Sequence, residues 1–350
     1  MTIDCFLIED KWLNNLQIEI VMKNKINAII LGLGITTSII ACSKIENGFQ
    51  SDNIRYKSNV ITAKRGMSLT MSDRINADGS TPPYTFELLN LRDAETGAAA
   101  PKEFSTDYEI LVFKQGMVFN AETDSTVELL NLKREVVKKP PMEFNPVSGQ
   151  LIFNRASANL PLGLYDFDVN FTNNRGTRLF EKLASIEIVD PTIEDMFEVT
   201  YQAATGSSAT EVFTTISAPQ ITCKKISNEG ARVILKVIDK TGKPFNPKAG
   251  EIVKRGDRPM FESHVKFNPV VTTDTAMICD FEVAPFPLAK LIDKAGTDWG
   301  YLNYYRIPMK FASVDGLPNN NVNPVFGFRV LMEGTYIVEV RLPSVTRIVK

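Results

Sequence analysis

The sequence of 350 residues predicts an all-β protein built from two tandem β-sandwich domains. Three observations lead to this prediction. Short segments rich in β-branched and aromatic residues recur along the chain, and Gly, Pro, Asn or Asp bounds them. Helical periodicity is scarce. A ten-residue motif occurs twice, once near the middle of the chain and once close to its end.

The strand-type segments are spread over the whole chain after its N-terminal region. Only one stretch has the features of a helix, Pro287–Ala295, with proline in its first turn and Gly296 after its end. The clearest expected strands are Tyr108–Phe113, Val127–Leu132, Leu151–Phe153, Ala231–Ile238 and Tyr336–Leu342.

The repeated motif is L-x-x-G-x-Y-x-(F/V)-x-V, found at Leu160–Val169 and Leu331–Val340. Glycine allows a tight turn into a strand, and the tyrosine and the residues after it then alternate onto one face. The motif resembles the tyrosine corner of immunoglobulin-like sandwiches, in which the tyrosine hydroxyl bonds back to upstream backbone. We therefore predict two immunoglobulin-like domains, at residues 58–190, with Arg178–Val189 as a final strand, and at residues 191–350, the larger of the two.

The N-terminal region predicts a lipoprotein signal peptide. Ile26–Ala41 carries no charge and follows the basic Met22–Lys25. The residues Ile39-Ile40-Ala41-Cys42 resemble the lipobox of bacterial lipoproteins, and the resemblance implies that Cys42 is acylated and becomes the first mature residue. The alternative is a buried helix that ends in a cysteine. Acidic residues before Met22 make a poor signal region, so residues 1–21 are interpreted as an upstream extension, 22–41 as the signal peptide and 42–57 as a linker.

The charge and the residue types argue against several functions. The net charge is −2, and no dense run of Lys or Arg offers a footprint for nucleic acid. His264 is the only histidine and lies in an expected strand, so neither a zinc site nor a catalytic triad of the usual kind is expected. We expect no cofactor, no metal and no enzymatic activity. The sequence pattern does not exclude a glycoside hydrolase site, because its two carboxylates come together only in the fold.

Two cysteines of the second predicted domain, Cys223 and Cys279, lie in strand-type segments. A disulfide between them would resemble the inter-sheet bridge of immunoglobulin domains. Free cysteine is equally common as a small buried residue. Both alternatives stay open.

Four aromatic residues are concentrated in one short stretch, and they are the candidates for carbohydrate binding. Aromatic rings stack on the apolar faces of pyranose rings, while nearby polar groups bond to hydroxyls. The alternative is that Trp299, Tyr301 and Tyr305 pack the sandwich as strand residues. The four are Trp299, Tyr301, Tyr304 and Tyr305.

Three further stretches, "GFQSDNIRY", "DGSTPPYTFELLNLR" and "KKPPMEFNPVSGQLIF", resemble an uncharacterised family of Bacteroidetes surface lipoproteins. Their layout is similar to that of SusE-type accessory lipoproteins of glycan-uptake systems. The resemblance implies a lipid-anchored, non-catalytic protein of the outer membrane, at the cell surface, that binds extracellular polysaccharide for an uptake system with a transporter complex as partner. It assigns no ligand-contacting residue. The alternative function is a structural or adhesive subunit that binds other proteins through strand edges.

Overall fold

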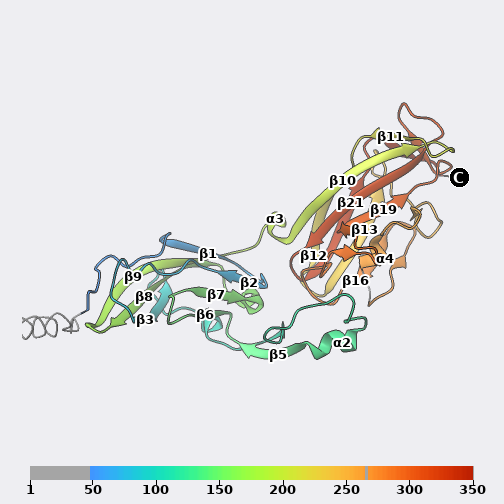
Figure 1. Ribbon diagram of the computed structural model, residues 1–350. Coiled ribbons are helices and arrows are strands. Elements are labelled where there is room, and N and C mark those ends of the chain that lie inside the picture. The colour runs from blue at the N-terminus through green and yellow to red at the C-terminus, as the bar shows by residue number, and fades with distance from the viewer. Residues whose placement is uncertain (1–47, 265–266, 350) are drawn as a thin grey trace, which may run out of the picture. The chain divides into compact units, whose positions relative to one another are not determined.

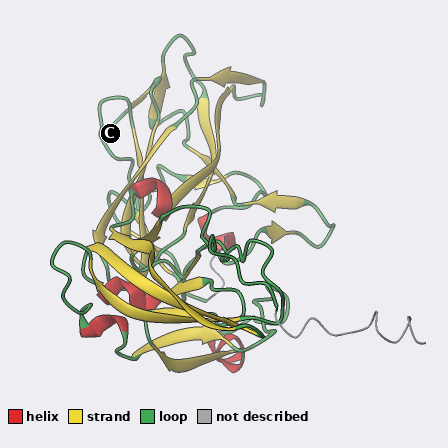
Figure 2. Cartoon of the chain, turned by 90° about the vertical axis from the view of Figure 1, so that its left-hand side faces the viewer, coloured by secondary structure: helices red, strands yellow, loops and turns green. Residues whose placement is uncertain are grey.

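The computed structural model describes residues 48–264 and 267–349. Strands and loops make up nearly all of it, and the helices are short (Figure 2), so the prediction of an all-β fold is confirmed. Cys42 and the predicted signal peptide lie outside the described residues. Within the described ranges, no helix is long and apolar enough to cross a membrane.

The described chain divides into two compact units. The smaller unit combines the described residues up to Ile54 with Ala77–Thr85 and Phe171–Arg178. Polar contacts link its segments; for example, Ser51 Oγ donates to Asp78 Oδ2 at 2.7 Å. The larger unit contains all the other described residues.

The strands form two sets, one on each side of residue 190. No described sheet combines strands from both sets. The domain boundary at residues 190–191 nevertheless stays a prediction.

The first set consists of a four-stranded sheet in the order β1-β9-β8-β3, a three-stranded sheet in the order β2-β7-β6 and the hairpin β4-β5. Its first strand, β1, runs parallel to its last, β9. The bounds are β1 Val60–Lys64, β2 Leu69–Met71, β3 Thr85–Asp93, β4 Tyr108–Phe113, α2 Val127–Leu132, β5 Arg134–Lys139, β6 Met142–Phe144, β7 Leu151–Asn154, β8 Gly163–Asn173 and β9 Gly176–Val189.

The second set forms two five-stranded sheets, in the orders β11-β10-β21-β19-β14 and β12-β22-β13-β16-β15, and two small hairpins, β17-β18 and β20-β23. The bounds are α3 Ile193–Met196, β10 Phe197–Ser207, β11 Phe213–Ile216, β12 Gln220–Ser227, β13 Ala231–Ile238, β14 Val253–Lys254, α4 Phe261–His264, β15 Val271–Thr272, β16 Met277–Asp280, β17 Leu291–Ile292, β18 Asp298–Gly300, β19 Leu302–Arg306, β20 Ala312–Val314, β21 Asn321–Val330, β22 Gly334–Arg341 and β23 Val345–Arg347.

The core of the second set lies between its two large sheets. Val233, Leu235 and Val237 alternate along β13, and they share one buried cluster with Phe326 and Phe328 of the other sheet. Alternating burial from two facing sheets is the packing of a β-sandwich. Strands β10 and β21 lie side by side although more than a hundred residues separate them in sequence (Figure 1).

The predicted tyrosine corners are present in both copies of the motif. Tyr165 on β8 donates its hydroxyl to the carbonyl oxygen of Pro161 at 3.4 Å, and Tyr336 on β22 donates to that of Met332 at 3.1 Å. Each strand begins at the motif glycine, and Gly334 has a φ of 142°. A Cβ on Gly334 would lie 2.7 Å from the carbonyl oxygen of Ser227, so only glycine fits there.

The expected strand Val127–Leu132 is wrong, because the segment forms helix α2. Thr126 is its N-cap, and its side chain accepts a hydrogen bond from the amide of Leu129. Leu130 is fully buried. A short apolar segment has the same composition in a helix and in a strand, and here the capping threonine selects the helix.

The expected helix Pro287–Ala295 is also wrong. Residues 291–300 form the hairpin β17-β18, whose turn Asp293 organises. The Asp293 carboxylate accepts hydrogen bonds from the amides of Ala295 and Thr297, each at 2.9 Å. Gly296 has a φ of 83°, so it serves the hairpin turn and not a helix end.

His264 ends the short helix α4 and does not lie on a strand as expected. Its Nε2 bonds to the carbonyl oxygen of Leu302 at 3.0 Å. Burial lowers the pKa of the imidazole. The imidazole is half-buried and lines a pocket.

Cys223 and Cys279 are free cysteines. They belong to β12 and β16 of the same sheet, with β22 and β13 between them. Three strand spacings of about 4.8 Å place them at least about 14 Å apart, about twice the limit for a disulfide. Burial raises the pKa of both thiols to about 12. The structure thus does not bear out an inter-sheet bridge.

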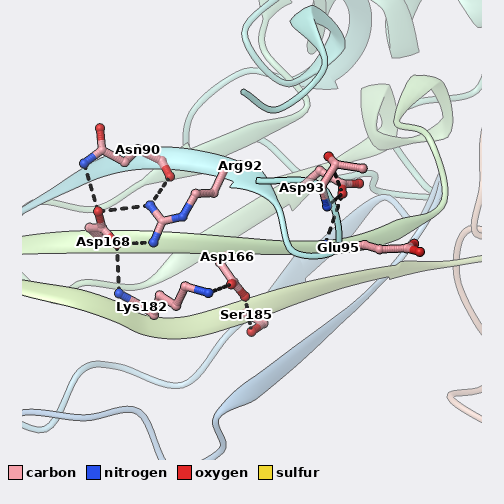
Figure 3. A network of polar contacts seen from close by, with 9 residues as sticks. Asn90, Arg92, Asp93, Glu95, Asp166, Asp168, Lys182 and Ser185 are labelled. Atoms are coloured by element: carbon pink, nitrogen blue, oxygen red, sulfur yellow. Dashed lines mark hydrogen bonds and ion pairs between the residues drawn. The ribbon is translucent and has the colours of Figure 1, made fainter. Parts of the chain in front are cut away.

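A buried charge network holds three strands of the first set together (Figure 3). Asp168, at the centre of β8, is 4% exposed. It accepts two hydrogen bonds from Arg92 on β3, at 2.7 and 3.0 Å, and one from Asn90 at 2.8 Å. From β9, the amide of Lys182 donates to it at 2.8 Å.

Asn90 and Lys182 both have positive φ, of 50° and 47°. Left-handed backbone is unfavourable for residues other than glycine. Asp168 thus bonds to an irregular position in each neighbouring strand. Arg92 contributes most to lowering the pKa of this carboxylate, and the Lys182 amide and Asn90 add to the effect.

Candidate carbohydrate-binding surface

An open hollow of about 510 Å³ lies on the second set of sheets. Three aromatic and four charged side chains line it, together with Thr200, Gly300 and Leu302. The aromatic residues are Tyr201, Trp299 and Tyr301, and the charged residues are Glu198, Lys290, Asp298 and Arg329.

The pairing of β10 with β21 brings together the residues of these two strands that line the hollow. Glu198 lies opposite Arg329, and Tyr201 lies opposite Gly327. A Cβ on Gly327 would lie 2.4 Å from Thr200 Oγ1 and 3.0 Å from the carbonyl oxygen of Tyr301. Glycine therefore lets the chain at Tyr301 pass close to β21 and reach the hollow.

Trp299 is positioned by the β17-β18 hairpin. Its indole Nε1 donates to Asp293 Oδ2 at 2.9 Å, and the other oxygen of that carboxylate accepts the two turn amides. The Thr297 amide first, and the Trp299 indole next, hold the pKa of Asp293 below its ordinary value. The turn that replaces the expected helix thus fixes the orientation of the indole.

The four predicted aromatic residues divide into two pairs. Trp299 and Tyr301 line the hollow and are half-buried. Tyr304 is 9% exposed and packs edge-to-face with Trp299 at a ring-centroid distance of 5.7 Å. Tyr305 is 2% exposed and stacks on Phe326 inside the sandwich. Core packing therefore describes Tyr305, whereas Tyr304 is buried against Trp299 and is not part of the core cluster.

The charged side chains of the hollow form two ion pairs. Arg329 Nη1 lies 3.8 Å from Glu198 Oε2, and its guanidinium lies 4.9 Å from the centre of the Tyr301 ring. Lys290 Nζ lies 3.5 Å from Asp298 Oδ2. Both carboxylates are half exposed, so they remain open to a ligand.

Sequence reasoning missed Glu198, Tyr201, Lys290 and Arg329. Tyr201 is 48% exposed on β10, roughly a hundred residues before Trp299 in the sequence. Its proximity to the hairpin depends on the pairing of β10 with β21, which no local pattern specifies. An aromatic residue in the mostly polar stretch Glu198–Gln202 was the one signal available.

Comparisons with known proteins gave no family. No family model matches the chain, and no curated protein matches it. One solved structure found is a SusE-like surface located polysaccharide binding protein from the heparin utilisation locus of Bacteroides thetaiotaomicron, with 9% identity and a TM-score of 0.22 over 83% of this chain. The match covers 53% of that protein, so the chain spans about half its length. Another is a protocadherin gamma B7 fragment with extracellular cadherin domains 1–4, with 10% identity, a TM-score of 0.12, and 83% of this chain and 77% of that one covered.

Proposed function

We propose that this chain is a non-catalytic carbohydrate-binding protein of the cell envelope. In this role it captures extracellular polysaccharide for an outer-membrane uptake system. The observation that carries the proposal is the hollow in which Tyr201, Trp299 and Tyr301 lie beside two carboxylates and two cations.

This combination of groups suits a sugar. Aromatic faces bury the apolar C–H surface of a pyranose ring, and polar groups around them orient its hydroxyls. Carboxylates accept hydrogen bonds, whereas Lys and Arg only donate them. The hollow offers both kinds of partner to a hydroxyl group, which is donor and acceptor at once.

Replacing Trp299 by alanine is expected to weaken glycan binding by about 1 to 3 kcal/mol, the scale of a lost aromatic contact. Tyr201→Ala is expected to act in the same direction, because the two residues line one hollow. Affinity electrophoresis of the full chain in gels containing a polysaccharide measures the effect.

Phe213→Ala is the matched control for these variants. Phe213 is 47% exposed on β11 of the same sheet, but it does not line the hollow. Its loss is expected to leave the retardation unchanged. Equal losses in all three variants would contradict a binding site at the hollow.

The cellular location rests on Cys42. We propose that acylation of this residue anchors the protein to the outer membrane, with the described domains outside the bilayer and a transporter complex as partner. Two or three acyl chains hold a protein firmly, whereas one is marginal.

A second candidate function is binding of another protein by strand addition. The outer edge of β10 is the observation that favours it. Strand β11 pairs only with Ala204–Ser207, so among the described strands none pairs with residues 197–203 on the side away from β21. An exposed edge of this length is a template for an added strand. A correctly folded protein that no glycan retards would favour this function over the first.

A further inference from the structure

We infer that the hollow selects uncharged saccharides and rejects acidic ones. This inference rests on the proposed function and adds the class of ligand. It follows from the way in which the four charged side chains are paired.

The charges that line the hollow sum to zero, and each cation has its own carboxylate. Arg329 faces Glu198 across the β10-β21 pair, and Lys290 faces Asp298 at the hairpin. An acidic sugar would need an unpaired cation. No charged residue that lines the hollow offers one.

A carboxylate or sulfate that approached Arg329 would meet Glu198 at the same time. Like charges brought together in this way repel each other, which is a means of rejecting the wrong partner. The same applies to Lys290, because Asp298 lies 3.5 Å from its ammonium group. An anion that approaches either cation therefore meets a carboxylate beside it.

A neutral hydroxyl meets no such opposition. The two ion pairs, at 3.5 and 3.8 Å, are longer than a hydrogen bond, whose N···O distance is about 2.7 to 3.2 Å. Each cation and each carboxylate thus keeps hydrogen-bonding capacity. One hydroxyl can donate to the carboxylate and accept from the cation, which satisfies both groups without breaking the pair.

The test compares neutral and acidic polysaccharides at several salt concentrations. The full chain is run by affinity electrophoresis against starch, mixed-linkage β-glucan, xylan, mannan and galactan, and against heparin and polygalacturonate. We expect retardation by at least one neutral glycan and none by the acidic ones. The neutral affinity should change by less than about twofold between low and high salt, because no net charge is neutralised on binding.

The double variant Glu198→Gln/Asp298→Asn leaves Arg329 and Lys290 unpaired. It is expected to gain retardation by heparin, at least about tenfold above the wild type at low salt and lost at high salt. The control Asp280→Asn/Asp315→Asn changes the net charge equally and frees two exposed cations elsewhere, those of the pairs Arg232–Asp280 and Lys240–Asp315. It should not gain this binding.

The outcomes separate the inference from the proposed function. Salt-sensitive binding of heparin or polygalacturonate by the wild type would overturn the inference and leave glycan binding standing. An equal gain in both double variants would also overturn it, because net charge alone would then explain the effect. Failure of every polysaccharide to retard the wild type would overturn the proposed function, and the inference with it.

Discussion

Replacing Asp168 by asparagine should lower the free energy of unfolding by about 3 to 5 kcal/mol, the loss typical of breaking a buried ion pair. The variant keeps the shape of the side chain but removes the charge that Arg92 contacts twice. It also weakens the bonds that join β8 to the irregular positions Asn90 and Lys182. Urea denaturation, followed by circular dichroism, measures the change.

Asp280→Asn is the matched control, because Arg232 donates to both oxygens of Asp280 at 2.6 and 3.0 Å. That pair is about half exposed on both sides. Exposed pairs contribute about 0 to 1 kcal/mol, so the control should change stability little. Similar losses in the two variants would show that burial of Asp168 does not matter.

The pH dependence provides a second readout for Asp168. Its pKa is lower in the folded protein than the value of about 3.9 expected for an unfolded chain. The ionised carboxylate therefore stabilises the fold above about pH 4, and this contribution is lost progressively as the pH falls through the folded pKa. The difference in stability between wild type and Asp168→Asn should be smaller at pH 3 than at pH 7.

Much of the fold followed from local patterns in the sequence. Strands β4 and β13 begin and end at the predicted residues, Tyr108–Phe113 and Ala231–Ile238. The tyrosine corners were predictable because the hydroxyl bonds to a residue only four positions away. Glycine, tyrosine and alternation are all visible in one short motif.

The errors arose where a local pattern fits two structures. Val127–Leu132 has the composition of a strand, yet Thr126 caps it as a helix. Pro287–Ala295 has a proline in its first turn and a glycine after its end, yet the Asp293 carboxylate closes a hairpin turn that begins within the stretch and extends beyond it. In both segments, hydrogen bonds between a side chain and nearby amides determine the local structure. The spacing of apolar residues does not predict such bonds.

Only those residues of the candidate site that are close together in the sequence could be predicted. Trp299 and Tyr301 are neighbours in the sequence, so composition located them. Tyr201 and Arg329 reach the hollow only through the pairing of β10 with β21. Composition also could not separate the exposed aromatic residues from Tyr305, because burial depends on which sheet covers each face.

Replacing Tyr305 by alanine should test whether this residue belongs to the core and not to the exposed aromatic group. The expected loss in the free energy of unfolding is about 3 to 5 kcal/mol. The ring lies 6.0 Å from that of Phe326, and its hydroxyl accepts a hydrogen bond from the Phe261 amide at 2.9 Å. Burial raises the pKa of this hydroxyl, as expected for a core group. The variant therefore creates a cavity and leaves a buried amide without its partner.

Tyr305→Phe keeps the ring and removes only the hydroxyl, so its loss should be about 1 to 3 kcal/mol, the cost of an unsatisfied buried donor. Trp299→Ala should destabilise the fold less than Tyr305→Ala, because the indole is half exposed at the hollow, but it should weaken glycan binding more. Thermal denaturation and affinity electrophoresis on the same three variants measure both quantities. If Trp299→Ala destabilised the protein as much as Tyr305→Ala without affecting binding, the whole aromatic cluster would belong to the core.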